Sequence, residues 1–211
     1  MTRPPDHQGD CFIRTPLARS FYDRDPISVA RSLLGMQLVR ASREGIVSGQ
    51  IVEVEAYLAE NDPACHAARG PTRSNQSIFG PAGHAYVYPI HSRHCVNAVT
   101  EPANRGSAVL IRAVEPLKGI ELMRNRRRAD NQRDLTRGPA RLCEAFDIDR
   151  SLDGWDLTTG SRLWITAGDP PAGGETGTSR RVGVTSAKDL ELRFFVAGNP
   201  CVSRLPGPGT A

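Results

Sequence analysis

The stretch GIVSGQIVEVEAYL, residues 45–58, constrains the fold more than any other part of the chain. Apolar, β-branched residues run through it, which predicts a strand, and successive side chains of a strand point to opposite faces. Glu53, Glu55 and Tyr57 would therefore share one face, whereas the intervening valines and Ala56 would share the other. Burying valine and alanine is ordinary, but two acids and a tyrosine on one face need a further explanation.

The rest of the chain predicts a mixture of helices and antiparallel strands. Apolar periodicity with suitable start residues predicts helices at residues 25–35, from Pro116 through Met123, and from Pro139 to residue 148. Further strands are predicted at residues 36–42, 84–100 with an interruption at 89–94, 106–116 and 193–198. Residues 59–83 and 166–181 are predicted to be long loops. Because there is no internal repeat and no regular β-α-β alternation, we expect an α+β domain built on an antiparallel sheet.

Size and composition fit one globular domain. The 211 residues are 39% hydrophobic and 24% charged, which suffices for a single continuous core. We expect flexible tails at residues 1–16 and 205–211, which are polar or rich in Pro and Gly, around an ordered domain of residues 17–204. No apolar run reaches the length of a membrane span or a signal-peptide core. We therefore expect no membrane partner and an intracellular location, cytoplasmic if the source is bacterial.

Charge and cysteine spacing bear on partners and metals. The formal net charge of +4 permits a polyanionic partner without requiring one. The five cysteines are scattered and form neither a CxxC pair nor a Cys/His spacing that suits zinc, so we expect free thiols and no metal site. The glycine-rich nucleotide motifs, the serine-hydrolase elbow and the zinc-protease helix motif are also missing from the sequence. We expect no cofactor.

Residues able to hold and activate a substrate are concentrated in one part of the chain. They are Glu53, Glu55, Tyr57, His66, Tyr86, Tyr88, His91, His94, Asn97 and Arg112. Aromatic rings beside an acid and a few amide or imidazole groups would suit a flat heterocycle held between π faces.

Five blocks follow one another between Leu17 and Arg204. They read GQIVEVEAYL…DPACHAARG, NQSIFGPAGHAYVYPI…HCVN, VLIRAVEPLKG, LTRGPARLCEAFDI and RVGV…RFFVAGNPCVSR. In order and spacing they resemble the blocks of the 3-methyladenine (alkyladenine) DNA glycosylases. The resemblance implies a single catalytic domain with a curved, mainly antiparallel sheet, surrounding helices and a protruding β-hairpin. It also implies an enzyme that flips alkylated or deaminated purines out of double-stranded DNA and hydrolyses the N-glycosidic bond.

The resemblance assigns a role to each pocket residue. Glu55 matches the general base that deprotonates a water for attack on the sugar C1′. The other matches are the stacking residues Tyr57 and Tyr88, the pocket histidine His66, Asn97, which crowds a guanine amino group, and Arg112, which holds the pocket and the sugar-phosphate. Neither lysine, Lys118 or Lys188, occupies such a position, so we expect no amine nucleophile for a Schiff base. The expected reaction is monofunctional and leaves an abasic site in an uncut strand.

One block departs from the family pattern. After YVY the family usually continues as Y-x-I-Y-G-M-x-x-C-x-N, and its second tyrosine wedges into the gap left by the flipped base. This chain reads YPIHSRHCVN, one residue shorter, with His91 at the wedge position. We expect His91 to fill the gap with less stacking area than tyrosine, and Arg73 and Arg141 to contact the DNA backbone. We expect Glu53 to be a structural carboxylate paired with an arginine, and Tyr86 to be a structural or rim residue.

Other functions fit parts of this pattern. A nucleic-acid-binding module of the same fold without the chemistry would bind DNA or RNA with steep salt dependence and release no base. A glycosidase for free nucleosides or sugars would need no basic surface and would turn over small substrates. A metal-dependent hydrolase is disfavoured, because His66, His91 and His94 have no carboxylate at a recognisable ligand spacing. Since one chain carries all five blocks, we expect a monomer.

Overall fold

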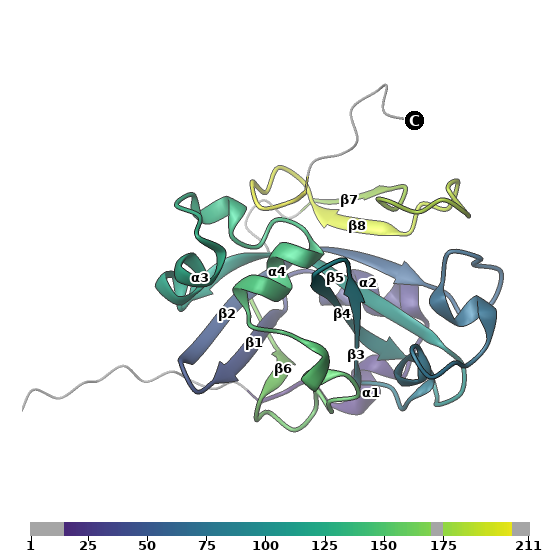
Figure 1. The fold of residues 1–211 in the computed structure, drawn as a ribbon. Helices are drawn as coiled ribbons and strands as arrows, with labels where there is room; N and C mark the ends of the chain where they lie inside the picture. The colour runs from purple at the N-terminus through teal and green to yellow at the C-terminus, as the bar shows by residue number, and fades with distance from the viewer. Residues whose placement is uncertain (1–14, 170–174, 204–211) are drawn as a thin grey trace, which may run out of the picture.

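The computed structural model describes residues 15–169 and 175–203 (Figure 1). The predicted tails lie outside these ranges except for Thr15 and Pro16, and Pro16 forms an isolated β-bridge with Thr166. The described ranges form one α+β domain around a curled antiparallel sheet, which confirms the predicted fold class.

The sheet has eight strands, and β2 is at its centre. The order along the main path is β3-β4-β5-β2-β1-β6, while β8 pairs with both β2 and β7. The strands are β1 Gln37–Ser42, β2 Gly45–Tyr57, β3 Ala85–Ile90, β4 Arg93–Thr100, β5 Ser107–Lys118, β6 Leu163–Thr166, β7 Thr176–Ser179 and β8 Arg193–Val196. Because β2 pairs with β1, β5 and β8, its side chains have neighbours from three other strands.

Two of the four helices in the described residues, α2 and α4, begin where the sequence predicts a start. They are α1 Arg19–Tyr22, α2 Pro26–Leu33, α3 Ile120–Arg127 and α4 Pro139–Ala145, with short 3₁₀ segments at His66–Arg69, Gln76–Phe79, Gln132–Asp134 and Arg150–Leu152. The Asp25 carboxylate accepts the Ser28 N–H at 2.8 Å and so caps α2, while Pro26 takes the first helical position. Pro139 likewise opens α4. The predicted starts of α2 and α4 are therefore confirmed.

Several stretches differ from the sequence prediction. Pro116 does not open a helix, because β5 continues through it and α3 begins only at Ile120. Pro116 lies opposite Gly49, beside a register shift between β2 and β5, where the missing proline N–H costs the ladder little. Within residues 166–181, predicted as a loop, β7 forms by pairing with β8. Strand β6 was not predicted.

The predicted interruption of the 84–100 strand is only a two-residue turn. Strands β3 and β4 form a hairpin in which Ile90 pairs with Arg93, so that His91 and Ser92 make the turn. His91 has a φ of 51°, the left-handed conformation that short hairpin turns favour. His91 is exposed, and so is its apolar neighbour Ile90, at 41%. The hairpin thus presents an apolar side chain and an imidazole at its tip.

Both faces of β2 are buried. Val52, Val54 and Ala56 belong to the main core, on which α2 also packs. Glu53 and Glu55, on the other face, have no exposed surface at all. Tyr57 packs instead on a smaller apolar cluster, made of Cys65, Ala67, Ile78, Tyr86, Val99 and Ala108. The two acids therefore lie inside the protein, where carboxylates require compensating partners.

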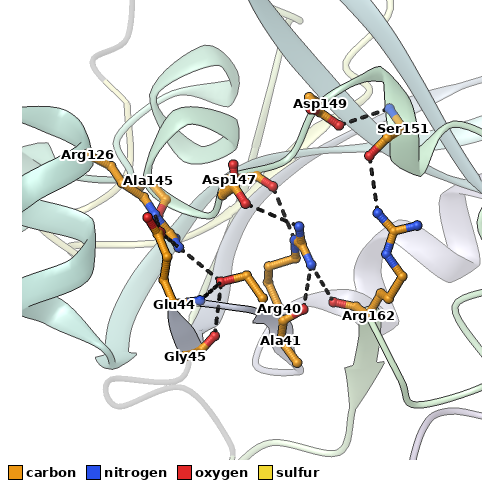
Figure 2. Close-up of polar contacts among 11 residues, drawn as sticks. Arg40, Ala41, Glu44, Gly45, Arg126, Ala145, Asp147, Asp149, Ser151 and Arg162 are labelled. Atoms are coloured by element: carbon orange, nitrogen blue, oxygen red, sulfur yellow. Dashed lines mark hydrogen bonds and ion pairs between the residues drawn. The ribbon is translucent and has the colours of Figure 1, made fainter.

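Arginines clamp the carboxyl end of α4 (Figure 2). Arg126 Nη1 donates to the Ala145 carbonyl at 3.0 Å, and Arg40 Nε donates to the Asp147 carbonyl at 3.1 Å. Arg40 also pairs with the Asp147 carboxylate at 3.2 Å. These bonds satisfy carbonyls at and just beyond the end of the helix, which have no partner within it. The clamp therefore ties the carboxyl end of α4 to β1 and α3.

Candidate active site

A cavity of about 580 Å³ is lined by residues of β2, β3, β4 and β5. This volume is typical of a small-molecule or base pocket. Five residues predicted for the pocket line it together: Tyr57, His66, Tyr88, Asn97 and Arg112. The loop after β2 contributes Pro63 and Ala64, and residues 182–186 form a further part of the wall. Strands that are distant in sequence therefore bring the predicted pocket residues to one place.

Glu55 lies beside this cavity with its carboxylate surrounded by donors. The Tyr57 hydroxyl donates to Oε2 at 2.9 Å, and the Val182 main-chain N–H donates to Oε1 at 2.7 Å. The Arg112 guanidinium lies 3.2 Å from Oε1. Tyr57 and Arg112 both line the cavity, so the buried carboxylate is one residue removed from its interior.

Arg112 also connects Glu55 to Glu53. Its Nε donates to Glu53 Oε1 at 2.7 Å, and Arg193 Nε donates to the same oxygen at 2.8 Å. The main-chain N–H and hydroxyl of Ser203 each donate to Glu53 at 2.7 Å. Burial opposes ionisation, but the two guanidinium groups and Ser203 outweigh it and lower the pKa of Glu53. Glu53 therefore has the arginine partner expected of a structural carboxylate.

Three aromatic residues pack against each other on one side of the cavity. The rings of His66 and Tyr88 have centroids 4.5 Å apart, and those of Tyr86 and Tyr88 are 5.4 Å apart. The Tyr86 hydroxyl lies 2.7 Å from His66 Nδ1. Asn97 is fixed in this wall, because its Nδ2 donates to the Tyr86 carbonyl at 2.9 Å. Tyr86, expected at the rim or in a structural role, is thus part of the cavity lining and orients His66.

His91, predicted to fill the gap left by a flipped base, and Arg73 and Arg141, predicted to contact the DNA backbone, lie outside this cavity. His91 is exposed at the hairpin tip, whereas its neighbours Pro89 and Ile90 line the cavity mouth. Arg73 is exposed in the loop before the Gln76–Phe79 segment. Arg141 is exposed on α4 and lines a separate cavity of about 400 Å³ with Asp134, Arg137 and Ser203. The structure does not bring these three predicted residues together with the pocket residues.

Two contributions to the site were not predicted from the sequence. One is the Val182 N–H on Glu55. The other is the ion pair of Asp62 and Arg181 behind Tyr57. Arg181 and Val182 belong to the RVGV sequence, which is part of the fifth block. The sequence therefore pointed to this segment, but not to the contacts that it makes. No side-chain pattern could identify a main-chain donor, because every residue except proline carries one.

Neither a group of metal ligands nor a membrane-spanning helix occurs in the described residues. Within residues 15–169 and 175–203, no three His, Cys, Asp or Glu side chains are grouped as metal ligands. Cys65, Cys95, Cys143 and Cys201 are free and buried. None of the helices in these ranges combines the length and the apolar character needed to cross a bilayer.

The fold and the cavity together define a protein that can hold a flat ring next to a buried carboxylate. The chain matches the family model of methylpurine-DNA glycosylase (MPG) over residues 20–200, and it belongs to this family. The family predicted from the five sequence blocks is therefore confirmed, and the protein is a DNA glycosylase, an enzyme that acts on DNA.

Curated relatives cover nearly the same length. A protein of Carboxydothermus hydrogenoformans is 47% identical over 189 residues, which are 89% of this chain and 98% of the relative. A protein of Mesorhizobium japonicum is 48% identical over 189 residues, 89% of this chain and 90% of the relative. One of Methanoculleus marisnigri is 46% identical over 191 residues, 89% of this chain and 98% of the relative. All three bear the name "Putative 3-methyladenine DNA glycosylase".

Proposed function

We propose that this protein removes alkylated or deaminated purines, of the 3-methyladenine, hypoxanthine and ethenoadenine type, from double-stranded DNA in base excision repair. Glu55 activates the water that attacks the sugar C1′. The observation that carries the proposal is the buried Glu55 carboxylate, held by Tyr57, Val182 and Arg112 beside a cavity with aromatic walls.

The cavity accounts for capture of the base. A purine inside the duplex is out of reach, so the nucleotide must be flipped out at a cost of a few kcal/mol. Stacking on aromatic faces returns about 1–3 kcal/mol per base, and Tyr57 and Tyr88 both supply such faces to the cavity. Asn97 crowds the 2-amino group of guanine, and its bond to the Tyr86 carbonyl, which fixes the side chain, supports this role. The pocket therefore favours purines that resemble adenine or hypoxanthine.

The carboxylate accounts for the hydrolysis. General-base assistance is worth about 10² to 10⁴ in rate, and a carboxylate also stabilises the positive charge that develops on the sugar. Arg112, between Glu53 and Glu55, keeps the two acids from repelling each other. A cationic alkylated purine is a good leaving group, so one acid suffices. Neither lysine of the chain is among the residues that line the cavity, which supports a monofunctional reaction.

The exposed residues account for DNA binding. His91, at the tip of the β3–β4 hairpin, enters the gap that the flipped nucleotide leaves, with Ile90 beside it. Arg73 and Arg141 are exposed cations, and they contact the phosphate backbone. Arg73 precedes the hairpin in the sequence and Arg141 follows it. The protein acts as a monomer, because one chain carries the whole cavity.

The test is base release from defined lesions. The protein is incubated with duplexes that carry one hypoxanthine, ethenoadenine or 3-methyladenine-type base, and abasic sites are counted without added metal. We expect release from at least one lesion in duplex DNA, and none from the corresponding free nucleoside. Salt-dependent binding to every duplex with no release would favour the non-catalytic binding module, and turnover of nucleosides would favour the small-substrate glycosidase.

A further inference from the structure

Asp62 and Arg181 form a fully buried ion pair behind the stacking wall. Arg181 Nη1 and Nη2 donate to the two Asp62 oxygens at 2.7 and 2.6 Å, and neither side chain is exposed to solvent. Two parallel bonds from a planar guanidinium fix its orientation as well as its position. Asp62 is itself held by the main-chain N–H groups of Leu58 and Ala64, at 3.0 and 3.2 Å. The pair is therefore anchored to the loop that follows β2.

Arg181 contacts strand β2 in two ways. Its Nη1 donates to the carbonyl of Ala56 at 3.1 Å. Ala56 is the residue between Glu55 and Tyr57. Its guanidinium carbon lies 4.6 Å from the centroid of the Tyr57 ring. Tyr57 lines the cavity and Arg181 does not, so the cation supports the ring from outside the cavity. The next residue, Val182, donates its main-chain N–H to Glu55.

We propose that Arg181, clamped by Asp62, is a positioning residue for base excision. It fixes the Val182 N–H on the Glu55 carboxylate and the Tyr57 ring beside it. The inference rests on the proposed role of Glu55 and goes beyond it, because Arg181 acts on the reaction through two groups that touch the base or the carboxylate. Without the Asp62–Arg181 pair, the segment of residues 182–186 loses one of its ties to β2, and the Val182 N–H is no longer held in a defined place on Glu55.

The substitution Arg181→Lys separates positioning from charge. Lysine keeps the positive charge opposite Asp62, but it cannot form the bidentate pair or lie flat on the Tyr57 ring. The matched control is Arg40→Lys, because Arg40 is also a buried arginine paired with an aspartate, Asp147, in the α4 clamp (Figure 2). Single-turnover base release, lesion-duplex affinity and melting temperature are measured for both variants.

We expect Arg181→Lys to lower the single-turnover rate by about 10- to 100-fold, since small misplacements of reacting groups have effects of this size. Arg40→Lys should keep the wild-type rate, although its melting temperature should be similar to that of Arg181→Lys. A full rate in Arg181→Lys, or a loss no larger than its loss of folded protein, overturns the inference. If the wild type releases no base, the proposed function fails. If Glu55→Gln is inactive while Arg181→Lys keeps full rate, only the positioning role fails.

A double-mutant cycle with Tyr57→Phe tests the route of the effect. Tyr57→Phe keeps the ring and removes the hydroxyl that donates to Glu55. If Arg181 acts through the donors of Glu55, the two substitutions are coupled, and the double variant retains more activity than the product of the two single effects. Effects that simply multiply would show that Arg181 acts independently of Tyr57 and would contradict this route.

Discussion

Glu53 and Arg193 form an ion pair without solvent exposure, in which Arg193 Nε lies 2.8 Å from Glu53 Oε1. The pair joins β2 to β8, and Arg112 extends it to β5 and Glu55. A structural acid and the proposed catalytic acid thus share one arginine. The two acids can be separated experimentally, because the loss of each should have a different consequence.

Glu53→Gln should destabilise the fold. Removing one partner of a buried ion pair leaves the other charge unpaired, which typically costs about 3–5 kcal/mol. Here Arg112 and Arg193 would both lose the negative charge that they share, although the glutamine amide keeps one acceptor oxygen. Urea denaturation should show the loss in the free energy of unfolding, and the folded fraction should still release base. Glu121→Gln, in an exposed pair with Arg124, is the control and should change stability by less than about 1 kcal/mol.

The same acid predicts how stability depends on pH. The folded protein holds the pKa of Glu53 below its ordinary value of 4.5, because Arg112, Arg193 and Ser203 outweigh the effect of burial. An acid with a lowered pKa contributes stability above the unfolded-state pKa and loses it as pH falls through the folded-state pKa. The free energy of unfolding should therefore decline below about pH 4.5. The decline should be shallower in Glu53→Gln, and equal slopes would contradict this assignment.

Glu55→Gln should separate binding from chemistry. The amide keeps the shape of the side chain but cannot accept a proton from water, so single-turnover release should fall by at least about 10²-fold. Affinity for a lesion duplex should remain close to that of the wild type, because the aromatic walls are unchanged. Gel-shift titration and abasic-site counting measure the two quantities. Release at the wild-type rate would remove Glu55 from the mechanism.

The hairpin tip should control how long the flipped nucleotide stays out. His91 has a φ of 51°, so His91→Gly removes the imidazole without straining the turn. We expect weaker capture of the flipped base in His91→Gly and stronger capture in His91→Tyr, because tyrosine has more stacking area. Fluorescence of 2-aminopurine beside the lesion reports flipping. If both variants flip the base as the wild type does, His91 does not fill the gap, and Ile90→Ala becomes the substitution to compare.

Local sequence was sufficient for several elements and for the family. Asp25 and Pro26 predict the start of α2, Pro139 predicts the start of α4, and the alternation of residues 45–58 predicts β2. These features depend on neighbours a few residues away, so they are visible in the chain itself. The predicted helix at Pro116 failed because the pairing of β5 with β2, a long-range interaction, outweighed a local start signal. Strand β7 was missed for the same reason, since it exists through its pairing with β8.

The sequence by itself determined that Glu53, Glu55 and Tyr57 share a strand face and that the pocket residues belong to one family pattern. Only the tertiary structure decided the surroundings of those side chains. Glu53 meets Arg193 from β8, and Glu55 meets a main-chain N–H from Val182, more than a hundred residues away in the chain. A carboxylate can be buried only where donors converge on it, and that convergence arises when distant strands pair.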